Sequence, residues 1–312
     1  MSSPKQPLLL FLKGVAMGAA DVVPGVSGGT IAFISGIYEE LLGSIRAVNL
    51  QSLKLLKDQG IGAFWNSING NFLLILFVGI IVSIASLAQL VSYSLEQYPI
   101  LVWSFFFGLV VASVIYIFRQ IPHLRWREWL ALWLGVLAAV TVAFMPPVQV
   151  SGEWWVVFLS GALAICAMIL PGISGSFILL MIGMYPLMIQ AVTDANWSLL
   201  SVFALGCGCG LLLFARLLSW LLERYHGTTI AVLTGFLLGS LLIIWPWKES
   251  LEVMIDSHGQ EVVLTHRLLM PAEFGAVTGI DPQTWAAVGL MLFGLVLVLG
   301  LENIGGRQRK EL

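Results

Sequence analysis

Long, uninterrupted apolar segments constrain this chain more than any other feature of its sequence. Six of them approach or reach the length of a membrane-crossing helix, which takes about 17–25 residues. Only 10% of the 312 residues are charged and 59% are hydrophobic, whereas a soluble domain carries about a quarter charged residues. The sequence therefore predicts an all-α polytopic membrane protein that forms one transmembrane domain over residues 1–312. The six segments are 72–93, 100–118, 128–145, 199–222, 229–246 and 284–301.

Two further apolar regions, 8–45 and 155–192, are each interrupted by a short polar stretch rich in glycine. Break one is Asp21–Thr30, with the sequence DVVPGVSGGT, and break two is Pro171–Ser176, with the sequence PGISGS. The apolar halves on either side of each break are short for independent spans. Each region therefore predicts a helical hairpin that enters the membrane and returns to the same side.

The basic residues favour one orientation, because lysine and arginine collect in cytoplasmic loops. If each hairpin returns to its own side, 12 of the 15 basic residues fall on the side of the N-terminus. The connection 46–71, the connection 119–127 and the C-terminal tail all lie on that side, whereas the long connection 247–283 lies on the other. We expect both termini to be cytoplasmic in a bacterial inner membrane.

The chain contains an internal duplication. An offset of 147 residues aligns break one with break two and gives nine identities over positions 14–38. The connection that follows is shorter in the second half of the chain, so the offset then becomes 127. This offset pairs Tyr98 with Tyr225 and Gly108 with Gly235. The repeats span about 8–150 and 155–305, and each has one re-entrant hairpin and three spans. Three is odd, so the second repeat is expected to be inverted, an architecture that many secondary transporters share.

The breaks have the composition of an anion site. Proline and glycine disfavour a continuous helix, and the amides at the start of the following half-helix attract anions. The alternative is structural: a tight hairpin whose serines cap helices. The predicted substrate-binding residues of the two breaks are Pro24, Gly25, Ser27, Gly28, Gly29, Thr30, Pro171, Gly172, Ser174, Gly175 and Ser176.

Charged residues in apolar surroundings add four candidates. Asp21 in break one aligns with Met168, and a buried acid there suggests substrate binding or coupling to an ion; the alternative is a capping aspartate in a water-filled vestibule. Arg216 lies within a predicted span and either faces an anion or extends its side chain to the interface. Glu39 and Arg46 could steer a headgroup toward break one, or could form a solvated interfacial cluster.

Other function classes find less support. The Gly-x-Ser-Gly pattern in both breaks also occurs in intramembrane serine hydrolases, but the four histidines fall in predicted loops, and a serine nucleophile needs a base within reach. The three cysteines lack the spacing of a metal site, and no nucleotide-binding glycine motif is present. We expect a transporter rather than an enzyme, without a metal, a cofactor or a nucleic-acid partner.

The two motifs resemble the signatures of the polyprenyl-phosphate transporter (PopT) family of bacterial membrane proteins. The first runs from Gly18 through break one to Gly36-Ile37-Tyr38-Glu39, and the second joins break two to Gly183-Met184-Tyr185-Pro186. The resemblance implies a translocase that returns undecaprenyl phosphate to the cytoplasmic leaflet for peptidoglycan and other envelope polymers. Our hypothesis for the mechanism places the phosphate headgroup between the hairpins, with Arg216 as countercharge and Asp21 coupled to H⁺ or Na⁺. Transport of a small soluble anion is the alternative, and the oligomeric state is left open.

Overall fold

The computed structural model describes residues 5–23, 26–121, 123–145, 150–255 and 261–310. Helices dominate the described residues, as the apolar segments predict. In the first half of the chain they are α1 (Lys5–Val22), α2 (Gly28–Ile34), α3 (Tyr38–Arg46), α4 (Leu50–Gln59), α5 (Ile61–Ser67), α6 (Gly70–Gln97), α7 (Pro99–Phe118) and α8 (Trp126–Phe144).

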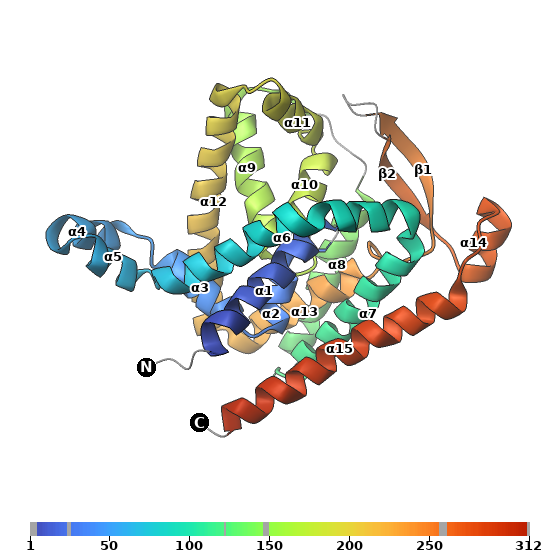
Figure 1. The fold of residues 1–312 in the computed structure, drawn as a ribbon, viewed down its shortest axis with the longest axis horizontal. Helices are drawn as coiled ribbons and strands as arrows, with labels where there is room; N and C mark the ends of the chain where they lie inside the picture. The colour runs from blue at the N-terminus through green and yellow to red at the C-terminus, as the bar shows by residue number, and fades with distance from the viewer. Residues whose placement is uncertain (1–4, 24–25, 122, 146–149, 256–260, 311–312) are drawn as a thin grey trace.

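The second half adds helices and one small antiparallel β-hairpin (Figure 1). The elements are α9 (Trp154–Ile169), α10 (Gly175–Met181), α11 (Tyr185–Thr193), α12 (Trp197–Arg224), α13 (His226–Ser240), β1 (Lys248–Ile255), β2 (Glu261–Leu268), α14 (Pro271–Thr278) and α15 (Thr284–Lys310). The connection 247–283, which was expected to be a loop, contains β1, β2 and α14, and the connection 46–71 contains α4 and α5.

Four described helices are long and apolar enough to cross a membrane, and a fifth span is added if the bent pair α10 and α11 counts as one. The four are α6, α7, α8 and α12, and α9 and the apolar part of α15 are shorter. The predicted span at 229–246 is shorter than expected, because α13 ends at Ser240. The prediction of a helical membrane protein is therefore confirmed.

Each returning half of a predicted hairpin is divided into two helices, which was not predicted from the sequence. α10 and α11 meet at 107°. Gly183, which lies between α10 and α11, has a positive φ of 69°. Gly36, which lies between α2 and α3, has a φ of 70°. A residue with a β-carbon disfavours this conformation. These glycines thus explain the second helix end within each region, after α2 and after α10.

Elements at corresponding places in the two halves have similar lengths and similar ends. α2 and α10 have seven residues each, α3 and α11 have nine, and α6 and α12 have 28. Tyr98 after α6 has φ −135° and ψ 50°, and Tyr225 after α12 has φ −133° and ψ 47°. The aligned positions of the sequence therefore adopt similar local structure.

Helices pack both within and between the halves. Within them, α1 lies on α6 and α9 lies on α12; between them, α8 lies on α13 and α7 on α15. Glycines make these approaches close: a β-carbon on Gly79 would lie 3.0 Å from the α-carbon of Gly14, and one on Gly235 would lie 3.0 Å from that of Gly135. Gly14 and Gly235 thus serve packing inside the chain.

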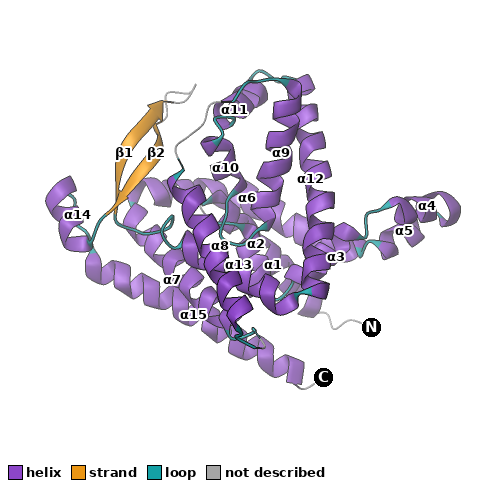
Figure 2. Cartoon of the chain, turned by 180° about the vertical axis from the view of Figure 1, so that it is seen from behind, coloured by secondary structure: helices purple, strands orange, loops and turns teal. Residues whose placement is uncertain are grey.

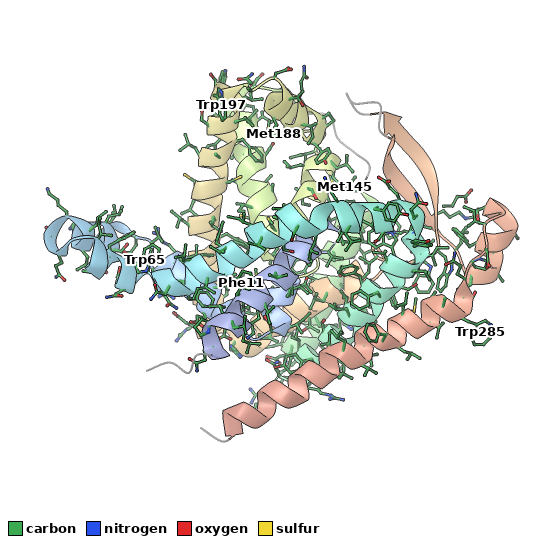
Figure 3. All side chains as sticks on the ribbon, in the orientation of Figure 1. Phe11, Trp65, Met145, Met188, Trp197 and Trp285 are labelled. Atoms are coloured by element: carbon green, nitrogen blue, oxygen red, sulfur yellow. The ribbon has the colours of Figure 1, made fainter. Side chains whose placement is uncertain are left out.

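The outer surface of the bundle carries many apolar side chains (Figure 3). Leu137 of α8 and Val296 of α15 are each 62% exposed, and Phe77 of α6 is 59% exposed. Such exposure is expected of helices that face lipid, whose chains are as apolar as leucine. The first residue of α1 and the last turn of α15 lie on the same side of the molecule (Figures 1 and 2).

Candidate functional site: two broken helices in contact

The two breaks, which are far apart in sequence, touch each other in the structure. Ser27 Oγ donates a hydrogen bond of 2.6 Å to the backbone oxygen of Met168. The backbone N–H of Gly172 donates to Thr30 Oγ1 at 3.0 Å. Tyr38, at the start of α3, donates its hydroxyl to the backbone oxygen of Ile169 at 3.1 Å. Side chains of the first half thus bind the backbone polar groups that the interruption of the second half leaves free.

Gly29 allows the close approach of the two breaks. A β-carbon at this position would lie 2.5 Å from the backbone oxygen of Ile169 and 2.9 Å from that of Met168. Contacts this short force neighbouring backbone to move. The aligned residue in break two is Ser176, which carries a side chain and is exposed. Only in break one does the other half of the chain lie against this position.

In break one, the start of α2 is capped by the chain itself. Asp21 Oδ1 accepts a hydrogen bond of 2.6 Å from the N–H of Gly28, and Ser27 Oγ accepts one of 3.1 Å from the N–H of Gly29. Because a β-carbon on Gly28 would lie 2.6 Å from Asp21 Oδ2, glycine also makes room for the carboxylate. Asp21 therefore occupies the place that an anionic ligand would take at this helix start. This geometry is that of a capping aspartate.

The other end of α2 receives a cation. Lys13 Nζ donates a hydrogen bond of 2.8 Å to the backbone oxygen of Ser35, which follows the last residue of α2. Lys13 and Asp21 both belong to α1, so α1 supplies a positive group at the C-terminal end of α2 and a negative group at its N-terminal end. Both charges are favourable with respect to the helix dipole. Lys13 was not among the predicted site residues, although a lysine within an apolar run was a usable signal.

Break two has no such caps. Ser174 precedes α10 with extended backbone and makes no capping hydrogen bond; its Oγ lies 2.8 Å from Ser176 Oγ. Among the residues that the structure describes, the N–H groups of Gly175, Ser176 and Phe177 donate no hydrogen bond. Met168 stands where break one has Asp21. The start of α10 thus presents free donors and two hydroxyls.

The remaining glycine of break two turns the chain. Gly172 has φ 87°, and a β-carbon there would lie 3.0 Å from Ser240 Oγ at the end of α13. Pro171 and Gly172 are buried against this helix end. Pro24 and Gly25, the corresponding predicted site residues of break one, lie outside the described residues.

Comparison with known proteins gives a consistent identification. Residues 17–262 match the model of the VCA0040-like family, described as undecaprenyl phosphate translocase-like. The chain belongs to this family. It is 51% identical over 296 residues to the polyprenyl-phosphate transporter of Vibrio cholerae, covering 95% of this chain and 96% of the relative. It is 30% identical over 272 residues to the polyprenyl-phosphate transporter of Staphylococcus aureus, covering 78% of this chain and 91% of the relative. No solved structure matches.

In this member of the translocase-like family, Arg216 does not contact either break. Its guanidinium is exposed, and Nη2 donates a hydrogen bond of 3.2 Å to the backbone oxygen of Val48, between α3 and α4. This contact fits the alternative in which the side chain extends toward the membrane boundary. It does not support a countercharge at the breaks.

Glu39 and Arg46 form ion pairs across the two halves. Arg46 pairs with Glu223 near the end of α12, and Glu39 lies 3.8 Å from Nδ1 of His226 at the start of α13. All four side chains are between 43% and 64% exposed. The geometry is that of a solvated cluster that joins α3 to α12 and α13, and it leaves the headgroup-steering role without direct support.

The hydrolase alternative finds no geometric support among the described side chains. Ser27 Oγ donates a hydrogen bond to a backbone oxygen, and Ser174 Oγ contacts another serine hydroxyl rather than a general base. His226 lies beside Glu39. Within the described part of the chain, no cluster of three or more histidine, cysteine or acidic residues could hold a metal ion.

Proposed function

We propose that this protein is a translocase for polyprenyl phosphate, and that it returns the monophosphate lipid to the cytoplasmic leaflet for reuse in envelope polymer synthesis. Membership of the translocase-like family and two relatives named polyprenyl-phosphate transporters support this substrate. The observation that carries the mechanism is the direct contact of the two breaks, through Ser27 with Met168 and Thr30 with Gly172. A binding site shared by two interrupted helices is the usual arrangement in secondary transporters.

The headgroup site is proposed at the start of α10, where Ser174, Gly175 and Ser176 present amides and hydroxyls. A phosphate monoester carries about −1.5 to −2 charges and strong acceptor oxygens, and it suits free N–H groups at a helix start. Ser27, Gly28, Gly29 and Thr30 form the opposing wall. Arg216 is left out of this proposal because its contact is with Val48.

The two halves are proposed to be inverted repeats that give alternating access to this site. The matched lengths of α2 with α10 and α6 with α12 support the repeat. The odd number of spans and the distribution of basic residues support the inversion, with both termini in the cytoplasm. Asp21 is the candidate for coupling to H⁺ or Na⁺, because loss of its charge would weaken the cap that fixes α2.

The test is reconstitution of the purified protein in liposomes that contain labelled undecaprenyl phosphate in both leaflets. A phosphatase added outside reaches only the outer-leaflet headgroups unless the lipid is moved. We expect the protein to render the inner-leaflet pool accessible as well, and the double variant Ser27→Ala with Ser174→Ala to slow this at least tenfold. Empty liposomes and liposomes with heat-denatured protein are the controls.

Two outcomes would overturn the proposal. The first is an inner-leaflet pool that stays protected while the protein is folded and correctly inserted. The second is competition by free inorganic phosphate as strong as that by a short-chain polyprenyl phosphate, together with uptake of the free ion. The second result would identify a transporter of small soluble anions.

A further inference from the structure

Helices α4 and α5 project from the side of the bundle. We call this segment, Leu50–Ser67, the flange. Figures 1 and 2 both show it apart from the other helices, joined to them near α3 and the start of α6. α4 packs against α5, and α5 packs against α6. The flange therefore presents most of its surface to the surroundings.

The flange is an addition to one half of the chain. The second half joins α11 to α12 with Asp194, Ala195 and Asn196, whereas the first half places residues 47–69 between α3 and α6. This difference of twenty residues accounts for the change of offset from 147 to 127 in the internal alignment. The helical core can thus make the same connection without a flange, so the flange has a separate role.

Local contacts fix the flange next to the start of α6, a helix long and apolar enough to cross a membrane. The apolar part of α6 that can cross the bilayer begins at Gly70, three residues after the end of α5. Trp65 of α5 donates its indole N–H to Asn71 Oδ1 at 2.9 Å, and its ring covers Gly70. Tryptophan is enriched at the membrane boundary because its ring is apolar and its N–H is polar. A capping box between Asn49 and Ser52 caps the N-terminus of α4.

The exposed face of α4 is both apolar and basic. Leu50, Leu53, Lys54 and Lys57 have helical spacing and lie on one face, and Leu50 is 78% and Leu53 49% exposed. Both lysines are exposed, and Asp58 is the acid of α4. Ile61, at the start of α5, is 75% exposed. Exposed leucines next to lysines, on a helix at the membrane boundary, are typical of segments that lie in the interface.

We propose that the flange lies in the headgroup layer of the leaflet on the side of the two termini, with Leu50, Leu53 and Ile61 among the acyl chains. Lys54 and Lys57 then bind anionic lipid headgroups, to which their long side chains can extend. Attachment of the flange to α3 at one end and α6 at the other keeps it at this depth. The inference does not depend on the transported substrate.

The first test measures the depth of single spin labels in the full-length protein. The three cysteines are replaced by alanine, and labels are placed at Leu53→Cys, at Ile61→Cys and, as a matched control on the other side of α4, at Gln51→Cys. In nanodiscs with anionic lipid, we expect the spin labels at 53 and 61 to collide mainly with oxygen. We expect the label at 51 to collide mainly with a water-soluble nickel chelate. If the labels at all three positions collide mainly with the nickel chelate, the proposal is overturned. It is also overturned if the labels at 53 and 61 are shielded from both reagents, which indicates a protein contact.

The second test separates the basic residues from the leucines. In Lys54→Gln with Lys57→Gln, we expect the label at 53 to shift toward water, and the difference between anionic and zwitterionic nanodiscs to disappear. An unchanged depth in anionic nanodiscs would overturn the headgroup contact. A variant in which residues 47–69 are replaced by the connection Asp-Ala-Asn of the second half should still fold, as judged by its thermal transition. Unfolding of this variant would overturn the separate role of the flange.

Discussion

The helix that starts at Gly28 receives an acid at its first turn and a lysine at its last, both from α1. The helix that starts at Gly175 has the same length and follows the same Pro-Gly-x-Ser-Gly pattern, but Met168 and Ser160 stand where α1 has Asp21 and Lys13. One break is therefore fixed by charges of its own half, and the other retains free donors. The two copies of the motif can thus have different roles: break one supports the structure, and break two remains open for a ligand.

Gly29→Val should produce the largest effect, because the added side chain forces break one away from the backbone of Met168 and Ile169. We expect loss of transport and destabilisation by about 1–3 kcal/mol, the usual cost of overpacking. The thermal transition in detergent and the liposome assay measure the two effects. The matched control is Ser176→Val at the aligned position, which is exposed and should fold normally. Equal thermal destabilisation of the two variants would show that the breaks are not packed differently.

From the sequence, a headgroup was expected between the two hairpins, but direct contact between the breaks was not predicted. The hydrogen bonds from Ser27 and Tyr38 to backbone oxygens depend on tertiary packing, which one sequence does not reveal. Arg216 was assigned to the headgroup because a charge in a span is costly, yet its long side chain reaches Val48 at the α3–α4 connection.

Secondary structure was predicted well where the pattern is long and apolar, as in α6, α7, α8 and α12. It was missed where short elements depend on a single residue. Gly36 and Gly183 lie with positive φ between the two helices of each returning half. Both glycines belong to the sequence motifs, but the motifs alone did not indicate that a helix would end there. The β-hairpin of β1 and β2 lies in a polar connection, where strand periodicity is weak.

Met168→Asp should transfer the acid of break one to break two. The side chain of Met168 is 38% exposed, so a carboxylate can be accommodated there. By analogy with Asp21 and Gly28, it would bind the free amides of α10 and repel a phosphate headgroup. We expect at least a tenfold weaker affinity for a short-chain polyprenyl phosphate, measured by titration calorimetry. Met168→Asn is the neutral control and should bind within about threefold of the native protein. Unchanged affinity in Met168→Asp would remove the headgroup from the start of α10.

Asp21→Asn and Lys13→Met should each weaken break one by a smaller amount. Loss of a helix cap costs about 1 kcal/mol, and a cation at a helix C-terminus contributes about 0.3–1 kcal/mol. We expect the thermal transition to fall by a few degrees in each variant, more for Asp21→Asn. Lys54→Met, on the exposed face of α4, is the control and should leave the transition unchanged. A stabilised Asp21→Asn variant would show that the charge serves another role than capping.

The smallest effect concerns Lys248, the first residue of β1. Lys248 Nζ donates to the backbone oxygen of Ile243, in the turn that follows α13, and lies 3.9 Å from the ring centroid of Trp103. Burial lowers the pKa of Lys248 from its usual 10.5 to about 7. Between these values the unfolded chain binds the proton and the folded protein does not, so folding stability should rise as the pH increases from 7 toward 10. Unlike Lys13, this lysine is thus a cost to the fold near neutral pH.

Lys248→Met should therefore raise the thermal transition at pH 7 and flatten its dependence on pH. The transition of the native protein should rise by a few degrees between pH 7 and 9, whereas that of the variant should change less. Arg267→Gln on the neighbouring strand is the control, because Arg267 is exposed and paired with Glu273, and it should keep the native slope. A native transition that falls over this range would contradict the assignment. If the slopes differ as expected, the two lysines have opposite effects on stability: Lys13 stabilises break one, whereas burial of Lys248 is a cost near neutral pH.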